Sequence, residues 1–282
     1  MPQPSSRVLV AGAGDVGLRV ARACAAAGAE ALALRRRRVD DADGVRMLTA
    51  DLASGEGLRR LPSGIDAVVF SAAPDARDEA AYRRLFLDGT RRLMDALDGP
   101  PSRVVFVSST AVYGEDAGER VDEDTPPRPG RFNGEVLLAA ERWLAGACTG
   151  AVALRLTGLY GPGRTWLLRR AFGGEPARRR WSNRIHVEDA ASAVVHLLDL
   201  AEPPGTLIGS DDRPTLEPEV LDWLRARRGL APLPLSPGPE TGRRASNVRL
   251  RATGWTPTHP DYRSGYPALL DGFPGSSEGS SS

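Results

Sequence analysis

The chain of 282 residues contains no lysine, because all 37 of its basic residues are arginines. Arginine stays protonated in proteins, so no side chain of this protein can act as a lysine-type base or form a Schiff base. The formal net charge is only +1. This balance gives no indication of binding to nucleic acid or to an anionic membrane, and we expect neither partner.

Cysteine and histidine are also scarce, with two and three residues respectively. Cys24 and Cys148 are too few for a disulfide framework, and both lie in alanine-rich segments typical of helices. The three histidines, His186, His196 and His259, do not cluster with cysteines at zinc-ligand spacing, so we expect no metal site. No apolar run approaches the ~20 residues that span a bilayer, and the N-terminus shows no export signal. We therefore expect a cytoplasmic protein.

Short apolar runs alternate with helical segments along the first part of the chain. Strands are predicted over 7–12, 29–34, 66–73, 103–109 and 151–161, and helices over 15–28, 78–97 and 135–148. Such alternation is typical of an α/β fold of the Rossmann type, in which a doubly wound parallel sheet carries helices on both faces.

The pattern changes after about residue 160. Residues 1–160 are expected to form the Rossmann domain, residues 161–274 a smaller mixed substrate lobe, and residues 275–282 a disordered tail. The helix predicted over 186–200 is a candidate for packing on the Rossmann domain. A short strand is predicted over 205–210.

The first strand ends in GAGDVG, a G-x-G-x-x-G pattern that opens a helix. In this pattern Gly12 allows the tight turn, Gly14 lets the backbone approach a pyrophosphate, and Gly17 permits close packing of the helix on the strand. Asp15 and Val16 lie at the helix N-terminus, whose amides and partial positive charge favour a phosphate. We predict a dinucleotide site, and a plain tight turn is the alternative.

The end of the second strand predicts which dinucleotide binds. A site for NAD places an acid there, whereas this strand runs into four arginines that begin with Arg35 and Arg36. A guanidinium can bind a ribose 2′-phosphate in a bidentate manner, so NADP(H) is predicted over NAD(H). A solvated basic turn is the alternative. Other positions predicted beside the coenzyme are Asp51 and Leu52 at the adenine, and Ser71, Ala72 and Ala73 after the fourth strand.

Three further motifs follow the glycine loop, namely VSSTAVYG (107–114), GLYGPGR (158–164) and RIHVEDAA (184–191). With the glycine loop they resemble the extended short-chain dehydrogenase/reductases of the NAD(P)-dependent epimerase/dehydratase type. The resemblance implies hydride transfer at a carbinol or carbonyl carbon of a small or nucleotide-sugar-like substrate. It also makes a homodimer through the long helices 78–97 and 135–148 a candidate assembly.

The resemblance also assigns substrate positions. Ser109 matches the serine that binds the substrate oxygen beside the nicotinamide, and a hydroxyl at the end of a strand can donate to a developing oxyanion. A serine that merely caps the next turn is the alternative. Neighbouring or substrate-side positions are Ser108, Thr110, Tyr160, Asn183 and His186, of which His186 is expected chiefly to hold its loop.

The Tyr-x-x-x-Lys pair of that family is missing. The helix that follows the serine motif places Arg131 at the tyrosine position and Glu135 at the lysine position, or Phe132 at the former if the register slips. The position of the family's active-site asparagine is Phe86. Tyr113 and Tyr160 are the nearest phenolic substitutes, although either more often packs structurally. The chain therefore resembles an atypical subgroup.

Two hypotheses follow from this pattern. One is an NADP(H)-dependent oxidoreductase or epimerase-like enzyme in which Ser109 polarises the substrate oxygen and the proton comes from water or from a non-standard residue. The other is a catalytically silent NADP(H)-binding protein that acts as a redox sensor or a partner subunit.

Overall fold

A parallel sheet of seven strands forms the centre of the computed structural model, which describes residues 6–41 and 43–273. The strand order is β11-β7-β5-β4-β1-β2-β3, and every neighbouring pair is parallel. The strands are β1 Arg7–Ala11, β2 Glu30–Arg35, β3 Val45–Thr49, β4 Ala67–Phe70, β5 Arg103–Ser109, β7 Ala151–Leu156 and β11 Thr206–Gly209. The predicted α/β fold is confirmed.

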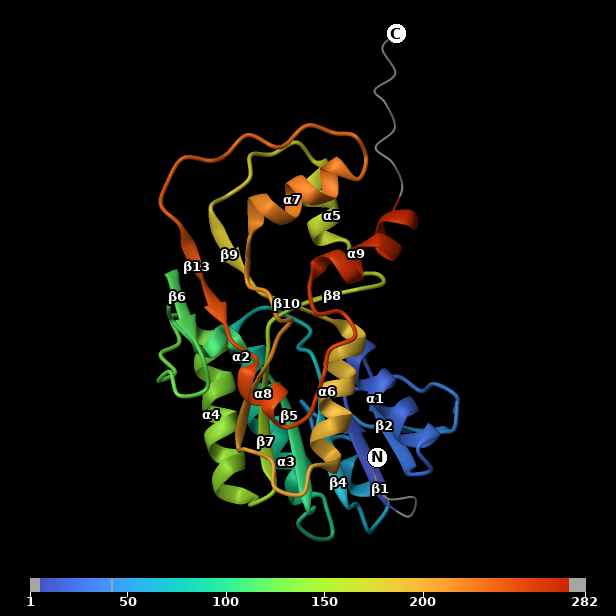
Figure 1. Cartoon of the computed structure of the whole chain (residues 1–282). Helices are drawn as coiled ribbons and strands as arrows, with labels where there is room; N and C mark the ends of the chain where they lie inside the picture. The colour runs from blue at the N-terminus through green and yellow to red at the C-terminus, as the bar shows by residue number, and fades with distance from the viewer. Residues whose placement is uncertain (1–5, 42, 274–282) are drawn as a thin grey trace.

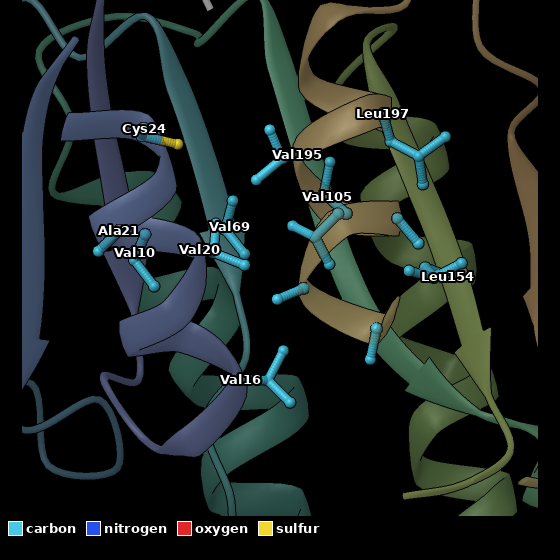
Figure 2. Packing of buried hydrophobic residues seen from close by; sticks show 14 of the residues in the cluster. Val10, Val16, Val20, Ala21, Cys24, Val69, Val105, Leu154, Val195 and Leu197 are labelled. Carbon is cyan, nitrogen blue, oxygen red and sulfur yellow. The ribbon is translucent and has the colours of Figure 1, made fainter. Parts of the chain in front are cut away.

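Successive side chains of each strand point to opposite faces of the sheet, and both faces are buried. In β1, Val8 and Val10 pack into one core cluster and Leu9 and Ala11 into the other. Helices α1 (Asp15–Ala26) and α6 (Val187–Asp199) cover the first face. Figure 2 shows how valines of these helices meet valines of the strands on this face.

The second face is covered by α4 (Phe132–Ala147) and by a long helix in three parts. The long helix runs through α2 (Glu79–Tyr82), a π-helical segment η2 (Arg83–Gly89) and α3 (Thr90–Asp95). The sequence predicted a long helix over 78–97, and the structure is helical over 79–95, with a π-helical middle that the sequence pattern did not indicate. At the end of the π-helical segment, the Thr90 hydroxyl donates to the Phe86 carbonyl at 2.6 Å. The Phe86 ring lies among the aromatic side chains of the core.

A smaller lobe lies over the carboxyl ends of the sheet strands (Figure 1). Its core is formed by α5 (Trp166–Phe172), α7 (Glu217–Ala226) and α9 (Tyr262–Asp271). A four-stranded sheet of order β12-β9-β13-β6 joins the lobe to the main body. The remaining elements are β6 Ala117–Val121, β8 Gly158–Tyr160, β9 Arg180–Ser182, β10 Arg184–His186, β12 Thr215–Leu216, β13 Thr241–Ala245, α8 Val248–Ala252 and the 3-10 turns η1 Leu58–Arg60 and η3 Thr110–Val112.

The boundary predicted between residues 160 and 161 does not separate two bodies. Strand β11 pairs with β7 as the seventh strand of the main sheet, and α6 packs against α1 on its face. In the opposite direction, β6 pairs with β13 of the later segment. The strand predicted over 151–161 is broken at Thr157, whose amide donates to the Gly209 carbonyl.

The tail predicted to be disordered, 275–282, lies outside the described residues. Within the part of the chain that the structure does describe, none of the helices is long and apolar enough to span a bilayer.

Candidate functional site

The glycine loop lies where the strand order reverses, between β1 and β4. Gly12 has a φ of +105°, and a Cβ built on it would lie 2.4 Å from the Ala72 backbone. A Cβ on Gly17 would lie 2.1 Å from the Gly12 carbonyl. A Cβ on Gly14, by contrast, meets nothing within 4 Å. The loop is therefore tightly packed on the protein side and open above Gly14, as a pyrophosphate cradle at a helix N-terminus requires.

The Ser71 hydroxyl donates to the Gly12 carbonyl at 2.9 Å and thereby fixes the loop to the end of β4. Asp15 begins α1 and is exposed. Its two carboxylate oxygens accept from Arg19 and from Arg164, each at 3.1 Å. The pair with Arg164 ties the GLYGPGR loop to the start of α1 and balances a negative charge beside the cradle. Sequence reasoning missed Arg164 because the two residues are far apart in the chain.

The arginines after β2 lie beside this loop. Arg35 donates through Nε to the Ala13 carbonyl at 2.7 Å, so its guanidinium is held against the loop backbone. Arg36 forms an ion pair with Asp75, which follows β4. The structure thus brings two of the four arginines to the edge where the coenzyme ribose is expected.

The predicted adenine-side residues have local roles. Asp51 closes a turn after β3, accepting from the Ala53 amide at 2.9 Å and from the Ser54 hydroxyl at 3.1 Å. Leu52 is buried in the second core cluster. Ala73 is exposed beyond the end of β4. Contact of these residues with a coenzyme stays a prediction.

Ser109 ends β5 and is half-buried at the carboxyl edge of the sheet. Its oxygen accepts a hydrogen bond of 3.2 Å from the Ala111 amide, so it caps the turn η3 as the alternative reading proposed. Capping uses a lone pair of the oxygen and leaves its hydrogen to be donated. Ser109 can therefore both cap the turn and polarise a substrate oxygen.

Ser108 and Tyr113 face the protein interior instead. The Ser108 hydroxyl donates to Glu141, which forms a buried ion pair of 2.6 Å with Arg155. Arg155 donates to the Tyr113 hydroxyl at 2.8 Å, and that hydroxyl donates to the Asp122 carbonyl. Burial raises the pKa of Tyr113. The structure does not bring these two predicted site residues to the open edge.

The segment that replaces the tyrosine–lysine pair forms the start of α4. Arg131 is its N-cap residue and Glu135 lies in its first turn, and both are exposed. Although they are one helical turn apart, no ion pair joins these two residues in the described part of the chain. Phe132 packs edge-on against Tyr82, with ring centroids 5.5 Å apart.

The substrate-side residues are mostly engaged within the protein. Asn183 donates to the Arg243 carbonyl and accepts from the Ala245 amide, both at 2.8 Å, so it anchors β13. The Thr110 hydroxyl faces the Leu156 carbonyl at 3.4 Å. His186 caps α6, as expected.

Tyr160 is buried beneath α9. A Cβ added to Gly265 would lie 2.2 Å from the Tyr160 hydroxyl, and this hydroxyl has no hydrogen-bond partner among the described residues. Burial raises the pKa of Tyr160, which disfavours its phenolate. It is therefore poorly placed to exchange a proton with a substrate.

A cavity of about 390 Å³ opens in the lobe, next to α5 and the start of α7. Its charged and aromatic lining residues are Trp166, Arg169, Arg170, Glu175, Arg178, Arg180 and Glu217. Arg170 pairs with both glutamates, whereas the guanidinium groups of the other three arginines have no acidic partner among the described residues. The cavity is thus basic, with an exposed tryptophan at its side.

Two arginines of residues 177–183, Arg178 and Arg180, line the cavity, whereas Arg179 forms an ion pair with Glu240. Trp181 does not line the cavity, because its indole donates to Glu240 at 3.0 Å and lies under Arg244. Trp166 supplies the aromatic surface instead.

Residues 8–208 match the family model for NAD dependent epimerase/dehydratase. This match agrees with the glycine loop at the switch point, with Ser109 at the edge of the sheet and with the three later motifs. The chain belongs to this family. Membership supports an oxidoreductase or epimerase-like function with a nicotinamide dinucleotide as the coenzyme class.

Relatives of this epimerase/dehydratase chain extend over nearly its whole length. It is 31% identical to the 3-diazoavenalumate denitrifying reductase of a Streptomyces species, over 92% of this chain and 98% of the relative. A structure from Methylobacillus flagellatus, provisionally assigned as an NAD-dependent epimerase/dehydratase, is 38% identical with a TM-score of 0.82, over 95% and 98% of the two chains. MoeE5 in complex with UDP-glucose and NAD is 25% identical with a TM-score of 0.77, over the same shares.

Proposed function

We propose that this protein is an NADP(H)-dependent oxidoreductase of the epimerase/dehydratase family that acts on an anionic substrate. The observation that carries the coenzyme choice is the position of Arg35, whose guanidinium lies against the glycine loop, with Arg36 next to it. A guanidinium at this place can form charge-assisted, bidentate contacts with a 2′-phosphate, which an acid there would repel.

The proposed reaction needs few protein groups. The nicotinamide, when bound, supplies or accepts the hydride. Ser109 donates its hydroxyl hydrogen to the substrate oxygen and stabilises the charge that develops there. Tyr113 and Tyr160 are both buried, so the proton is exchanged with water or with Glu135 at the start of α4. Loss of one positioned proton-transfer group costs about 10²–10⁴-fold in rate, which slows such an enzyme without stopping it.

The substrate class follows from the basic cavity of the lobe. Three arginines without acidic partners suit phosphate or carboxylate groups, and Trp166 offers a surface for a planar ring. The UDP-glucose bound by MoeE5 and the 3-diazoavenalumate named for the Streptomyces reductase suggest two families of compounds to test.

A silent NADP(H)-binding protein is the second candidate. The observation that favours it is the start of α4, where the tyrosine–lysine positions hold the exposed Arg131 and Glu135 and where Phe132 packs against Tyr82. Such a protein binds the coenzyme and turns over no substrate.

The coenzyme part is tested by fluorescence titration with NADPH and NADH. We expect NADPH to bind more tightly, and Arg35→Ser and Arg36→Ser each to weaken NADPH by about tenfold to a hundredfold while changing NADH little. Arg60→Ser is the matched control, because this exposed arginine lies outside the site. Tighter binding of NADH by the wild-type protein contradicts the proposal.

The catalytic part is tested by incubating the NADP⁺ complex with UDP-sugars, which carry carbinol carbons, and the NADPH complex with aromatic carboxylates that carry a carbonyl. Reduction of NADP⁺ or an epimerised product in the first assay, or oxidation of NADPH in the second, supports the enzyme. Tight NADPH binding with no turnover on any member of the panel supports the silent protein.

A further inference from the structure

Three potential metal ligands converge where α6 begins and where the loop before α9 crosses it. His186 precedes α6, Glu188 lies in its first turn, and His259 comes from a segment much later in the chain. One ligand atom of each residue lies within 4.8 Å of the other two. Glu188 Oε2 is 4.0 Å from His186 Nδ1 and 3.9 Å from His259 Nε2.

The protein holds these side chains together by other contacts. The buried Asp189 accepts from the amides of Thr258 and His259, at 2.7 and 2.9 Å, and so fixes the late loop on the first turn of α6. The His186 ring is buried and meets the Tyr160 ring edge-on, with centroids 5.1 Å apart. The fold itself therefore brings the three side chains together.

The remaining contacts leave two of the ligand atoms available. Glu188 turns Oε1 to Arg19 at 3.3 Å, which leaves Oε2 directed between the two imidazoles. His259 Nδ1 is buried and has no hydrogen-bond partner among the described residues, and the nearest oxygen of Glu188 is beyond hydrogen-bond distance of its Nε2. His186 Nδ1 accepts the capping hydrogen bond of 3.3 Å from the Glu188 amide, and an ion bound to this nitrogen would replace that bond.

Two imidazoles and one carboxylate form a set of three protein ligands that binds zinc in other proteins, with water as the fourth ligand. Ligand bonds of about 2.0–2.2 Å in tetrahedral geometry put the donor atoms about 3.3–3.6 Å apart. The observed separations around Glu188 are a few tenths of an ångström longer, which small side-chain rotations can close. A hard ion such as Mg²⁺ prefers oxygen ligands and octahedral geometry, so it fits poorly.

We propose that His186, Glu188 and His259 bind one divalent transition-metal ion, Zn²⁺ being the best suited, with water in the fourth position. The ion would join the loop before α9 to the first turn of α6, and so the lobe to the main sheet. The proposal does not rest on the proposed function.

The experiment uses the untagged full-length protein after treatment with a chelator. Titration with Zn²⁺ by calorimetry is expected to show one saturable site, and Zn²⁺ to raise the unfolding temperature while Mg²⁺ leaves it unchanged. Co²⁺ in place of zinc is expected to give the visible absorption bands of a four-coordinate ion.

The chain offers a matched control. Glu188→Gln and His259→Gln are each expected to weaken Zn²⁺ binding at least about a hundredfold, because each removes one of three ligands. His196→Gln should leave it unchanged, since this third histidine lies later in α6 and contacts the Thr253 hydroxyl at 2.9 Å.

Absence of saturable Zn²⁺ binding overturns the proposal, as does binding that survives Glu188→Gln without loss. Because Glu188 is exposed, its replacement keeps the fold, which circular dichroism verifies. The two cysteines are buried and cannot mimic the result.

Discussion

Two adjacent serines of β5 illustrate what decides a role at the scale of a residue. Alternation along the strand turns Ser108 toward α4, where its hydroxyl meets the buried Glu141, and turns Ser109 toward the other side. The two residues have the same chemistry and differ in surroundings. Only Ser109 keeps a hydroxyl hydrogen at the open edge of the sheet.

Ser109→Ala is expected to lower kcat about a hundredfold to a thousandfold, because one preorganised donor to a developing oxyanion is lost. The NADPH dissociation constant should not change. Steady-state kinetics on the best substrate of the panel, together with coenzyme titration, measures both quantities.

Ser108→Ala is the matched variant. It is expected to lower the free energy of unfolding by about 1–3 kcal/mol, because it removes a partner of a buried carboxylate, and to leave kcat within a few-fold of the wild type. Unchanged turnover in Ser109→Ala would place the active centre elsewhere.

At the scale of an element, the strand–turn–helix unit of the glycine loop contains glycines of two kinds. Gly12 is required by its left-handed backbone and by the closeness of Ala72, so it serves folding. Gly14 has an ordinary φ of −77° and open space above it, so nothing in the protein itself requires a glycine there. We interpret the second glycine as a position that a bound ligand approaches closely.

Substitution by alanine separates these two roles. Gly14→Ala is expected to change the free energy of unfolding by no more than about 1 kcal/mol and to weaken NADPH and NADH alike by at least about tenfold. Gly12→Ala is expected to destabilise the protein by about 3 kcal/mol or more, through strain and contact with the Ala72 backbone.

Urea unfolding without coenzyme and fluorescence titration with coenzyme distinguish the two variants. A Gly14→Ala protein that binds NADPH normally would show that the open space is not the pyrophosphate cradle.

At the scale of the whole molecule, the late segments complete the early ones. Arg243 of β13 donates to the carbonyls of Thr110 and Tyr113, so the lobe fixes the turn that follows Ser109. Strand β11 completes the sheet. The two predicted domains are therefore expected to unfold together.

This junction also makes stability depend on pH. Asp211 is buried between β11 and α7, with Arg184 Nη1 3.9 Å from its Oδ2 and with Asp212 and Asp261 adding negative charge. Burial raises its pKa from 3.8 to about 7. The folded state therefore binds the proton more tightly than the unfolded state, and stability falls as the pH rises from about 4 to about 7.

Asp211→Asn is expected to remove this dependence while keeping the acceptor for the Arg213 amide. The wild type should lose at most about 4 kcal/mol relative to the variant between these pH values, because one pKa unit corresponds to about 1.4 kcal/mol. Urea unfolding of both proteins across this range measures the difference. Parallel curves for the two proteins contradict the expectation.

What the sequence by itself determined is local in origin. Short continuous apolar runs predicted most strands of the main sheet, and the glycine spacing predicted the loop at its switch point, because both patterns lie in neighbouring residues. The arginines after β2 also adjoin that loop, because the loop, α1 and β2 follow one another within a short segment of the chain.

The tertiary structure alone decided the features that depend on distant partners. It set which serine of β5 faces outward, placed β11 in the main sheet, paired Arg36 with Asp75 and brought His186 to His259. Such contacts are selected by the packing of whole faces, whose energy is shared among many residues. A short stretch of sequence does not determine this shared packing energy, so no motif predicts these contacts.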